Sequence, residues 1–333
     1  MRGSVAMFLV SAGCDEHDLQ DHAGRHLYLC NIMQPPTASQ SGTALAAGLW
    51  MLLGSFVFSI MAAFAHVLGD QVDWQIVALA RSGVAFALAI LLAWLGGGRL
   101  VFWRPGMLWV RSLSGSVSLV CTFYALTHLP LAEVLTITNT FPVWLAVLSW
   151  PMLGERPGID VWMASILGVV GVALIKQPWS RGDLAIDWLP LLAAFMAACS
   201  TALAMLGLNR LGHIDTRAVV AHFSGVGILF ALVAMLLFPR EHLETSVTAG
   251  SVPWLLAGVG LTATAGQLCL TRAFTTGKAS RVAVVGLSQV LFAVAIDWIF
   301  FQKPVNALAM LGMVLVVVPT AHVIMQRDRK RVA

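Results

Sequence analysis

Long stretches of apolar residues, separated by short polar segments, make up most of the chain from Thr43 onward. Each stretch is long enough for a helix that crosses a membrane, which takes about 20 residues. Glycine, proline and charged residues cluster where the stretches end, as at helix ends. The pattern predicts an all-α polytopic membrane protein with ten transmembrane helices, at 43–67, 74–96, 107–127, 131–152, 158–175, 187–208, 218–238, 252–274, 280–301 and 305–325.

The composition excludes an ordinary soluble protein. Of the 333 residues, 59% are hydrophobic and only 11% are charged, whereas a water-exposed surface carries about 25–35% charged residues. The lipid bilayer is therefore the expected surrounding. The net charge of +4 comes from scattered basic residues, so the sequence predicts no nucleic-acid partner.

The two ends of the chain differ from the apolar body. Residues 1–42 are mostly polar and are predicted to be a disordered cytoplasmic tail, although translation from Met33 is an alternative start. Residues 326–333 form a short basic tail. Because lysine and arginine near span ends remain on the cytoplasmic side, their distribution predicts the orientation. Most of them, Arg111 included, fall on the side of both termini, against Lys176, Arg181, Arg240 and Lys303 on the other. We therefore expect a multi-pass protein of the cytoplasmic (inner) membrane with both termini cytoplasmic.

The order of sequence marks repeats once. Pro157 follows the fourth span as Pro304 follows the ninth, and Tyr124-Ala125-Leu126 ends the third span as Arg272-Ala273-Phe274 ends the eighth. Each half, 43–176 and 187–325, holds five spans, and an odd number turns the second half upside down relative to the first. The sequence predicts two inverted five-helix repeats.

A known family shares this ordered set of features. The arginine in the second span, Tyr124-Ala125-Leu126, Phe141-Pro142-Val143-Trp144 and Leu153-Gly154-Glu155-Arg156-Pro157 resemble the EamA-type members of the drug/metabolite transporter superfamily. The resemblance covers 43 to about 325. It implies a secondary active transporter, permease or exporter, of a small organic solute, with a central cavity lined mainly by spans three, four, eight and nine.

Polar residues inside the spans are the candidates for solute binding, because ionisable and amide groups in hydrocarbon need a partner or a water-filled cavity. Span three carries Ser114, Ser118 and Cys121 on one face, but serine also satisfies itself on its own helix. Arg81 would attract an anionic group of the solute or form a fixed pair within the protein, with equal weight. The predicted substrate-binding residues are Arg81, Tyr124, Asn139, Trp144, Gln267 and Gln289.

Energy coupling is limited by the motifs present. No phosphate-binding GxxxxGK[ST] loop occurs, so a gradient or exchange is expected to drive transport. Asp297 is a candidate for proton coupling, with pairing to Arg81 as the alternative, and His222 is a second candidate, with a solvated side chain near the interface as the alternative. No metal site or cofactor is predicted, and the protein is not expected to be an enzyme. A membrane-embedded enzyme remains the competing class, and a homodimer is one possible assembly.

Overall fold

The structure is a computed structural model, and it describes residues 40–325 except 69–70, 99, 102, 104, 130, 178, 180–187, 238–249 and 303–304. The chain divides into two compact units, 1–40 and 41–333. The predicted tail at 326–333 lies outside the described residues, and so does the tail at 1–42 apart from residues 40–42, which begin the first described helix. The helices of the structure belong to the second unit, and the first of them begins at Gln40, the last residue of the first unit.

Every described regular element is an α-helix, and the predicted spans are confirmed to within three residues. The helices are α3 (Gln40–Leu68), α4 (Trp74–Leu95), α5 (Gly106–His128), α6 (Leu131–Thr138), α7 (Phe141–Leu153), α8 (Ile159–Lys176), α9 (Trp188–Asn209), α10 (Thr216–Leu237), α11 (Val252–Thr276), α12 (Ala279–Gly286), α13 (Ser288–Phe301) and α14 (Ala307–Met325).

Ten spans result when α6 joins α7 and α12 joins α13. Nine of them are long and apolar enough to cross a membrane, counting only the described part of the chain. The span outside this set is α5, whose middle holds Ser112, Ser114, Ser116 and Ser118. These serines are buried in the bundle. Helix α5 is thus too polar to be counted as a span by its composition alone, but its polar side chains face other helices and not lipid.

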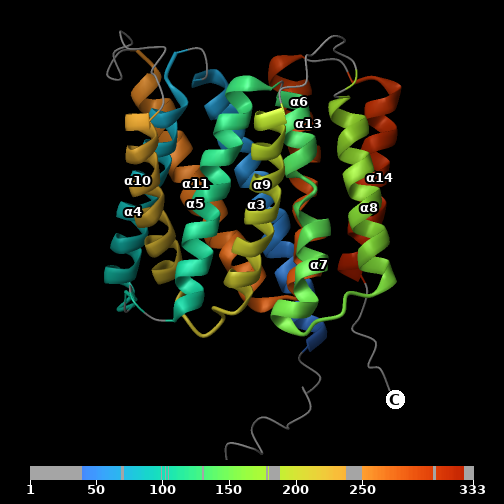
Figure 1. The fold of residues 1–333 in the computed structure, drawn as a ribbon, viewed down its shortest axis with the longest axis horizontal. Coiled ribbons are helices and arrows are strands. Elements are labelled where there is room, and N and C mark those ends of the chain that lie inside the picture. The colour runs from blue at the N-terminus through green and yellow to red at the C-terminus, as the bar shows by residue number, and fades with distance from the viewer. Residues whose placement is uncertain are drawn as a thin grey trace, which may run out of the picture. The chain divides into compact units, whose positions relative to one another are not determined.

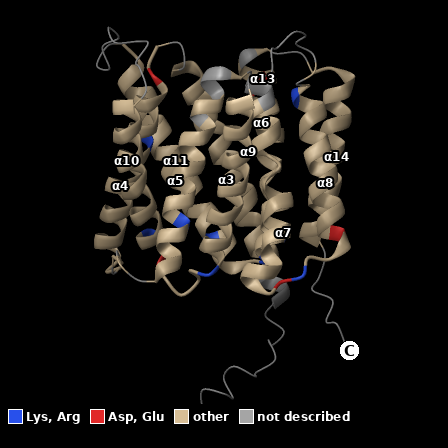
Figure 2. Ribbon diagram, viewed as in Figure 1, with Lys and Arg blue, Asp and Glu red and all other residues tan. Residues whose placement is uncertain are grey.

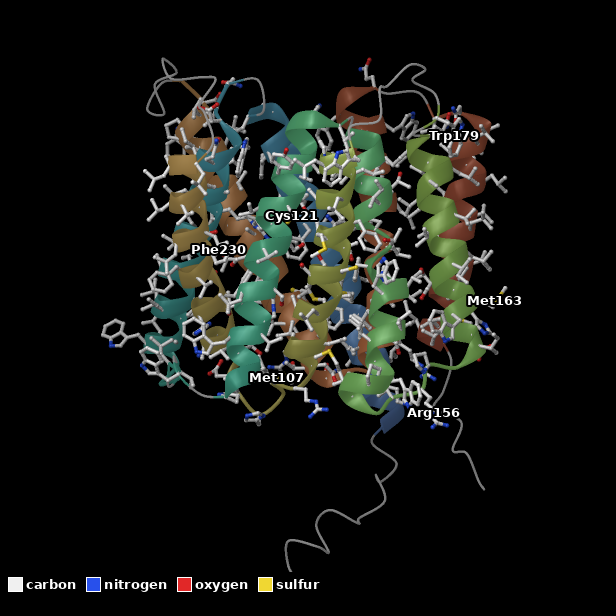
Figure 3. All side chains as sticks on the ribbon, viewed as in Figure 1. Met107, Cys121, Arg156, Met163, Trp179 and Phe230 are labelled. Carbon is white, nitrogen blue, oxygen red and sulfur yellow. The ribbon has the colours of Figure 1, made fainter. Side chains whose placement is uncertain are left out.

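The helices run side by side between two edges of the body (Figure 1). Helix α3 begins and α14 ends at the same edge, called the terminal side below. Figure 3 shows Arg156 at this side and Trp179 at the opposite one, and α5 rising from Met107 towards Cys121. Most charged residues lie at the two edges, and the middle of the bundle is almost free of them (Figure 2).

Exposed tryptophans mark both edges. Trp94, Trp103 and Trp150 are exposed near the terminal side, and Trp179, Trp188, Trp254 and Trp298 near the opposite side. Tryptophan concentrates where hydrocarbon meets lipid headgroups, because its ring is apolar and its N–H polar. The two belts delimit the apolar band of a membrane protein.

The two halves exchange their first helices. Helix α9, first of the second half, packs along α5 and α7 of the first. Helix α3 packs on the corresponding helices of the second half: Gly54 lies against Cys269 of α11, Phe56 contacts Phe292 of α13 with ring centroids 5.5 Å apart, and Ser59 donates to the backbone oxygen of Gln289. Neither half buries its own first helix alone.

The last helices of the halves, α8 and α14, pack directly on each other. A Cβ added at Gly171 would lie 2.6 Å from the backbone oxygen of Gly312. Small residues allow the two helices to approach this closely. Within lipid there is no hydrophobic driving force between helices, so close van der Waals packing holds them together. The repeat boundaries at 43–176 and 187–325 stay predictions.

The fourth span of each half is interrupted at mid-length. Asn139 and Thr140 form a turn between α6 and α7, and Leu287 separates α12 from α13. Pro142 lies in the first turn of α7, where its missing N–H leaves a carbonyl of the preceding turn without its helical partner. Interrupted spans expose backbone groups at bilayer depth only where protein or a cavity surrounds them.

Candidate functional site

Arg81 lies two turns into α4, as predicted, and lines a small cavity between α4, α10 and α11. The lining includes Ser82, Phe223, Ser224 and Gln267. Its volume is about 10 Å³, close to the lower limit for holding one water molecule. Gln267, also predicted, is 5% exposed and lines this cavity. Of the four spans expected to line the solute cavity, only the eighth, α11, contributes here.

Arg111 is the residue that the sequence interpretation misplaced. It was counted among the basic residues near span ends, whereas the structure puts it inside α5 with 1% exposure. Its guanidinium carbon lies 4.1 Å from the centroid of the Phe223 ring. Its position three residues before Ser114, on the face that also holds Ser118, was the available signal.

Arg81 and Arg111 both have Phe223 as a neighbour. Neither forms an ion pair with a carboxylate among the described residues. Phe223 lines the cavity beside Arg81 and also carries Arg111 on its ring. The structure thus brings two cations and a buried amide to one region of the bundle.

His222 is buried in α10 beside this region. Its Nδ1 lies 2.7 Å from the hydroxyl oxygen of Ser112, and its ring meets Trp109 edge to face with centroids 4.7 Å apart. Trp109 is therefore partly inside the bundle. A histidine at 4% exposure is not the solvated side chain that was the alternative interpretation.

Asn139 and Trp144 belong to the interrupted fourth span. The side-chain amide of Asn139 donates to the backbone oxygen of Leu135 at 2.7 Å, so this donor is satisfied within its own helix. The Trp144 N–H donates to the hydroxyl of Thr140 at 3.1 Å, and its ring contacts Phe195 of α9. Both side chains stabilise the turn between α6 and α7.

The remaining candidates lie elsewhere. Gln289 follows the break in the ninth span, and its backbone oxygen accepts the Ser59 hydroxyl at 2.9 Å. Tyr124 is half-buried near the end of α5, and Asp297 is half-buried in α13; each has an interaction partner. Across the described ranges, no three His, Cys, Asp or Glu side chains are grouped as a metal site requires.

Comparison with known proteins decides the family. The sequence profile of the EamA-like transporter family matches the chain twice, over 45–177 and 184–325. The chain belongs to this family. A solved crystal structure with 18% sequence identity covers 83% of this chain and 95% of its own, with a TM-score of 0.71. At that identity the likeness shows the fold alone, in agreement with the all-helical EamA architecture.

Relatives of this EamA-family chain are named as transporters. The pseudopaline exporter CntI of Pseudomonas aeruginosa is 30% identical over 87% of this chain and 98% of its own length. A riboflavin transporter of Rhizobium johnstonii is 26% identical over 90% of this chain and 99% of its own. The predicted function is confirmed at this level: the protein is a membrane transporter of small metabolites.

Proposed function

We propose that the protein is a secondary carrier of the bacterial cytoplasmic membrane that moves an organic metabolite by alternating access. The observation that carries this proposal is the pair of interrupted spans, at Asn139–Thr140 and at Leu287. In inverted-repeat carriers, discontinuous helices at corresponding positions of both halves form the solute site near the bilayer midplane. Asn139, Trp144 and Gln289 lie at or next to these breaks, and Tyr124 ends the adjoining α5.

The proposed orientation places the terminal side in the cytoplasm. Arg156, Arg210, Arg217 and Arg272 lie at the terminal-side ends of the described helices. Positive residues beside span ends are retained in the cytoplasm. Reporter fusions after Arg331 and at Arg240 should show opposite sidedness, and the same sidedness for both would contradict the ten-span topology.

Proton coupling is the proposed source of energy, with His222 and Asp297 as the groups that exchange protons. His222 is the stronger of the two, because it is buried, bonded to Ser112 and next to Phe223 at the cavity. Imidazole is the side chain whose ordinary charge change falls nearest to neutral pH. The cations near it are Arg111 on α5 and Arg81 on α4, so a proton on His222 adds to an existing positive field.

Flux by the purified full chain in sealed proteoliposomes tests the proposal. Metabolite profiling of cells with and without the protein supplies the candidate solutes, which are then loaded into the vesicles. A carrier gives saturable movement of a chemically unchanged solute, and an imposed pH gradient accelerates it. Conversion of the solute to a product of different mass would indicate the competing class, a membrane-embedded enzyme. Absence of protein-dependent flux for every metabolite whose level changes would refute the proposed function.

A further inference from the structure

Two arginines lie on α4 and α5, two helices that pack on α10, and both have Phe223 of α10 as a neighbour. Arg111 of α5 is 1% exposed, and its Nε atom is buried without a hydrogen-bond partner. Arg81 of α4 lines the small cavity, and Phe223, which lines it too, contacts the guanidinium of Arg111. Like charges at close range in a weakly polar interior raise the free energy of the folded protein unless an anion lies between them.

What surrounds Arg111 compensates this charge only in part. The ring of Phe223 offers its face to the guanidinium at 4.1 Å, which stabilises a cation far less than a carboxylate does. Gly115, one turn further along α5, provides the space: a Cβ there would overlap an Arg111 Nη atom and lie 2.8 Å from the Phe223 ring. The helix thus holds a fully buried arginine without supplying an acidic partner from the described residues.

The cavity next to these cations is polar. Gln267 is buried and lines this cavity, and Ser82 and Ser224 add two hydroxyl groups. An amide N–H and hydroxyls are the donors that complete the coordination of an oxyanion whose charge is met by arginine. Phe223 lines the cavity and also contacts Arg111. Movement of this ring would connect the cavity with the space around the Arg111 guanidinium.

We propose that Arg81 and Arg111 together bind the anionic oxygen group of the transported solute, with Gln267 as an additional hydrogen-bond donor. This inference rests on the proposed carrier function and adds to it a contact for one end of the solute, in a cavity whose lining includes none of the residues at the breaks in the fourth and ninth spans: the solute is an organic anion that carries a carboxylate or a phosphate. Because the cavity has a volume of only about 10 Å³, Phe223 turns aside when the anion enters. The anion then takes over from the ring as the partner of Arg111.

A structural arginine and an anion-binding arginine respond oppositely to removal. Replacing a paired, structural arginine lowers stability, because its partner is left buried and alone. Replacing a buried cation that has no acidic partner raises stability, because the desolvation cost disappears. Arg111→Met suits this test, since methionine fills the space and contacts Phe223 favourably. Arg217→Met is the matched control, because Arg217 donates to the backbone oxygen of Leu92 at 3.0 Å.

The experiment measures the thermal midpoint of the purified full chain in detergent at constant ionic strength. Wild type, Arg81→Met, Arg111→Met and Arg217→Met are each measured in sodium chloride alone and with added succinate, inorganic phosphate or the neutral analogue succinamide. We expect Arg111→Met to raise the midpoint in chloride by a few degrees, and Arg217→Met not to raise it. Succinate or phosphate should raise the wild-type midpoint by about 2–5 °C.

The same anions should leave Arg81→Met and Arg111→Met unchanged, and should still stabilise Arg217→Met. A response to succinate alone assigns a carboxylate, and a response to phosphate alone assigns a phosphate. The proposal is overturned if neither anion stabilises the wild type beyond succinamide, or if both cavity variants keep the full response. If the protein binds the anions but carries no solute, the carrier function is refuted and anion binding by the two arginines stands. If it carries a neutral solute and does not bind the anions, this inference is refuted and the carrier function stands.

Discussion

Gly115→Ala tests whether the position of Arg111 over Phe223 matters. The added methyl group would lie 2.8 Å from the Phe223 ring and closer still to Arg111, whereas carbon atoms at rest are about 3.5–4.0 Å apart. The ring must therefore move by roughly 0.6 Å or more, and the guanidinium further. Nothing else in α5 needs to change, since the substitution alters one methyl group.

The expected cost follows from three effects. Overpacking of this kind costs about 1–3 kcal/mol, and loss of the cation–π contact at 4.1 Å costs about 0.5–2 kcal/mol. Alanine in place of glycine inside a helix returns about 1 kcal/mol. We expect a net loss of about 0.5–4 kcal/mol, and anion affinity lowered by about tenfold for each 1.4 kcal/mol that falls on binding.

The assay is the thermal midpoint with and without succinate or phosphate, and the matched control is Gly83→Ala. Gly83 also lies inside a helix, α4, but a Cβ there meets nothing within 4 Å, so this variant should equal or exceed the wild type. If Gly115→Ala behaves like Gly83→Ala in both stability and anion response, the packing described around Arg111 is wrong.

Other outcomes are expected from the same structure. Gly171→Ala should destabilise the fold by about 1–3 kcal/mol in thermal unfolding, because its Cβ would meet the Gly312 backbone oxygen, which cannot move alone. Asn139→Ala should slow flux while the amount of folded protein is unchanged, since one hydrogen bond is worth about 0.5–1.5 kcal/mol; normal flux would make the residue structural. Arg81→Lys keeps the charge but loses the planar guanidinium that binds an anion through two hydrogen bonds. The apparent KM should therefore rise while the thermal midpoint falls little. His222→Gln should abolish acceleration by a pH gradient without abolishing downhill exchange.

Most of the fold was predictable because hydrophobic length alone defines a span. The ten stretches correspond to the helices within three residues, including α5, whose serines lower its hydropathy. The breaks in the fourth and ninth spans were less accessible. Pro142 was a sequence signal for the break in the fourth span. Before the break at Leu287 there is only a single glycine, Gly286, and no proline.

The candidate site was only partly predictable, since burial depends on which helices meet. Arg81 and Gln267 share a cavity as polar residues inside spans should, yet nothing in the local sequence shows that α4 and α11 are neighbours. Arg111 was missed because a basic residue near the start of a span reads as a cytoplasmic flank. Its burial depends on Phe223, which lies far away in the chain and reaches it through the packing of α10 on α5.

Helix α3 packs on helices of the second half, so it is synthesised well before the helices that cover it. Helix α3 ends at Leu68, but its partner α11 begins only at Val252. At translation rates of about 5–20 residues per second, roughly 10–40 s pass before that partner emerges. During this interval α3 lies in the bilayer with Ser55 and Ser59 on a surface that later becomes interior. Both hydroxyls can bond to their own helix meanwhile, as Ser59 still does to the backbone oxygen of Ser55. Ser59, whose hydroxyl bonds to its own helix, thus suits a helix that lies in lipid before its partners are made.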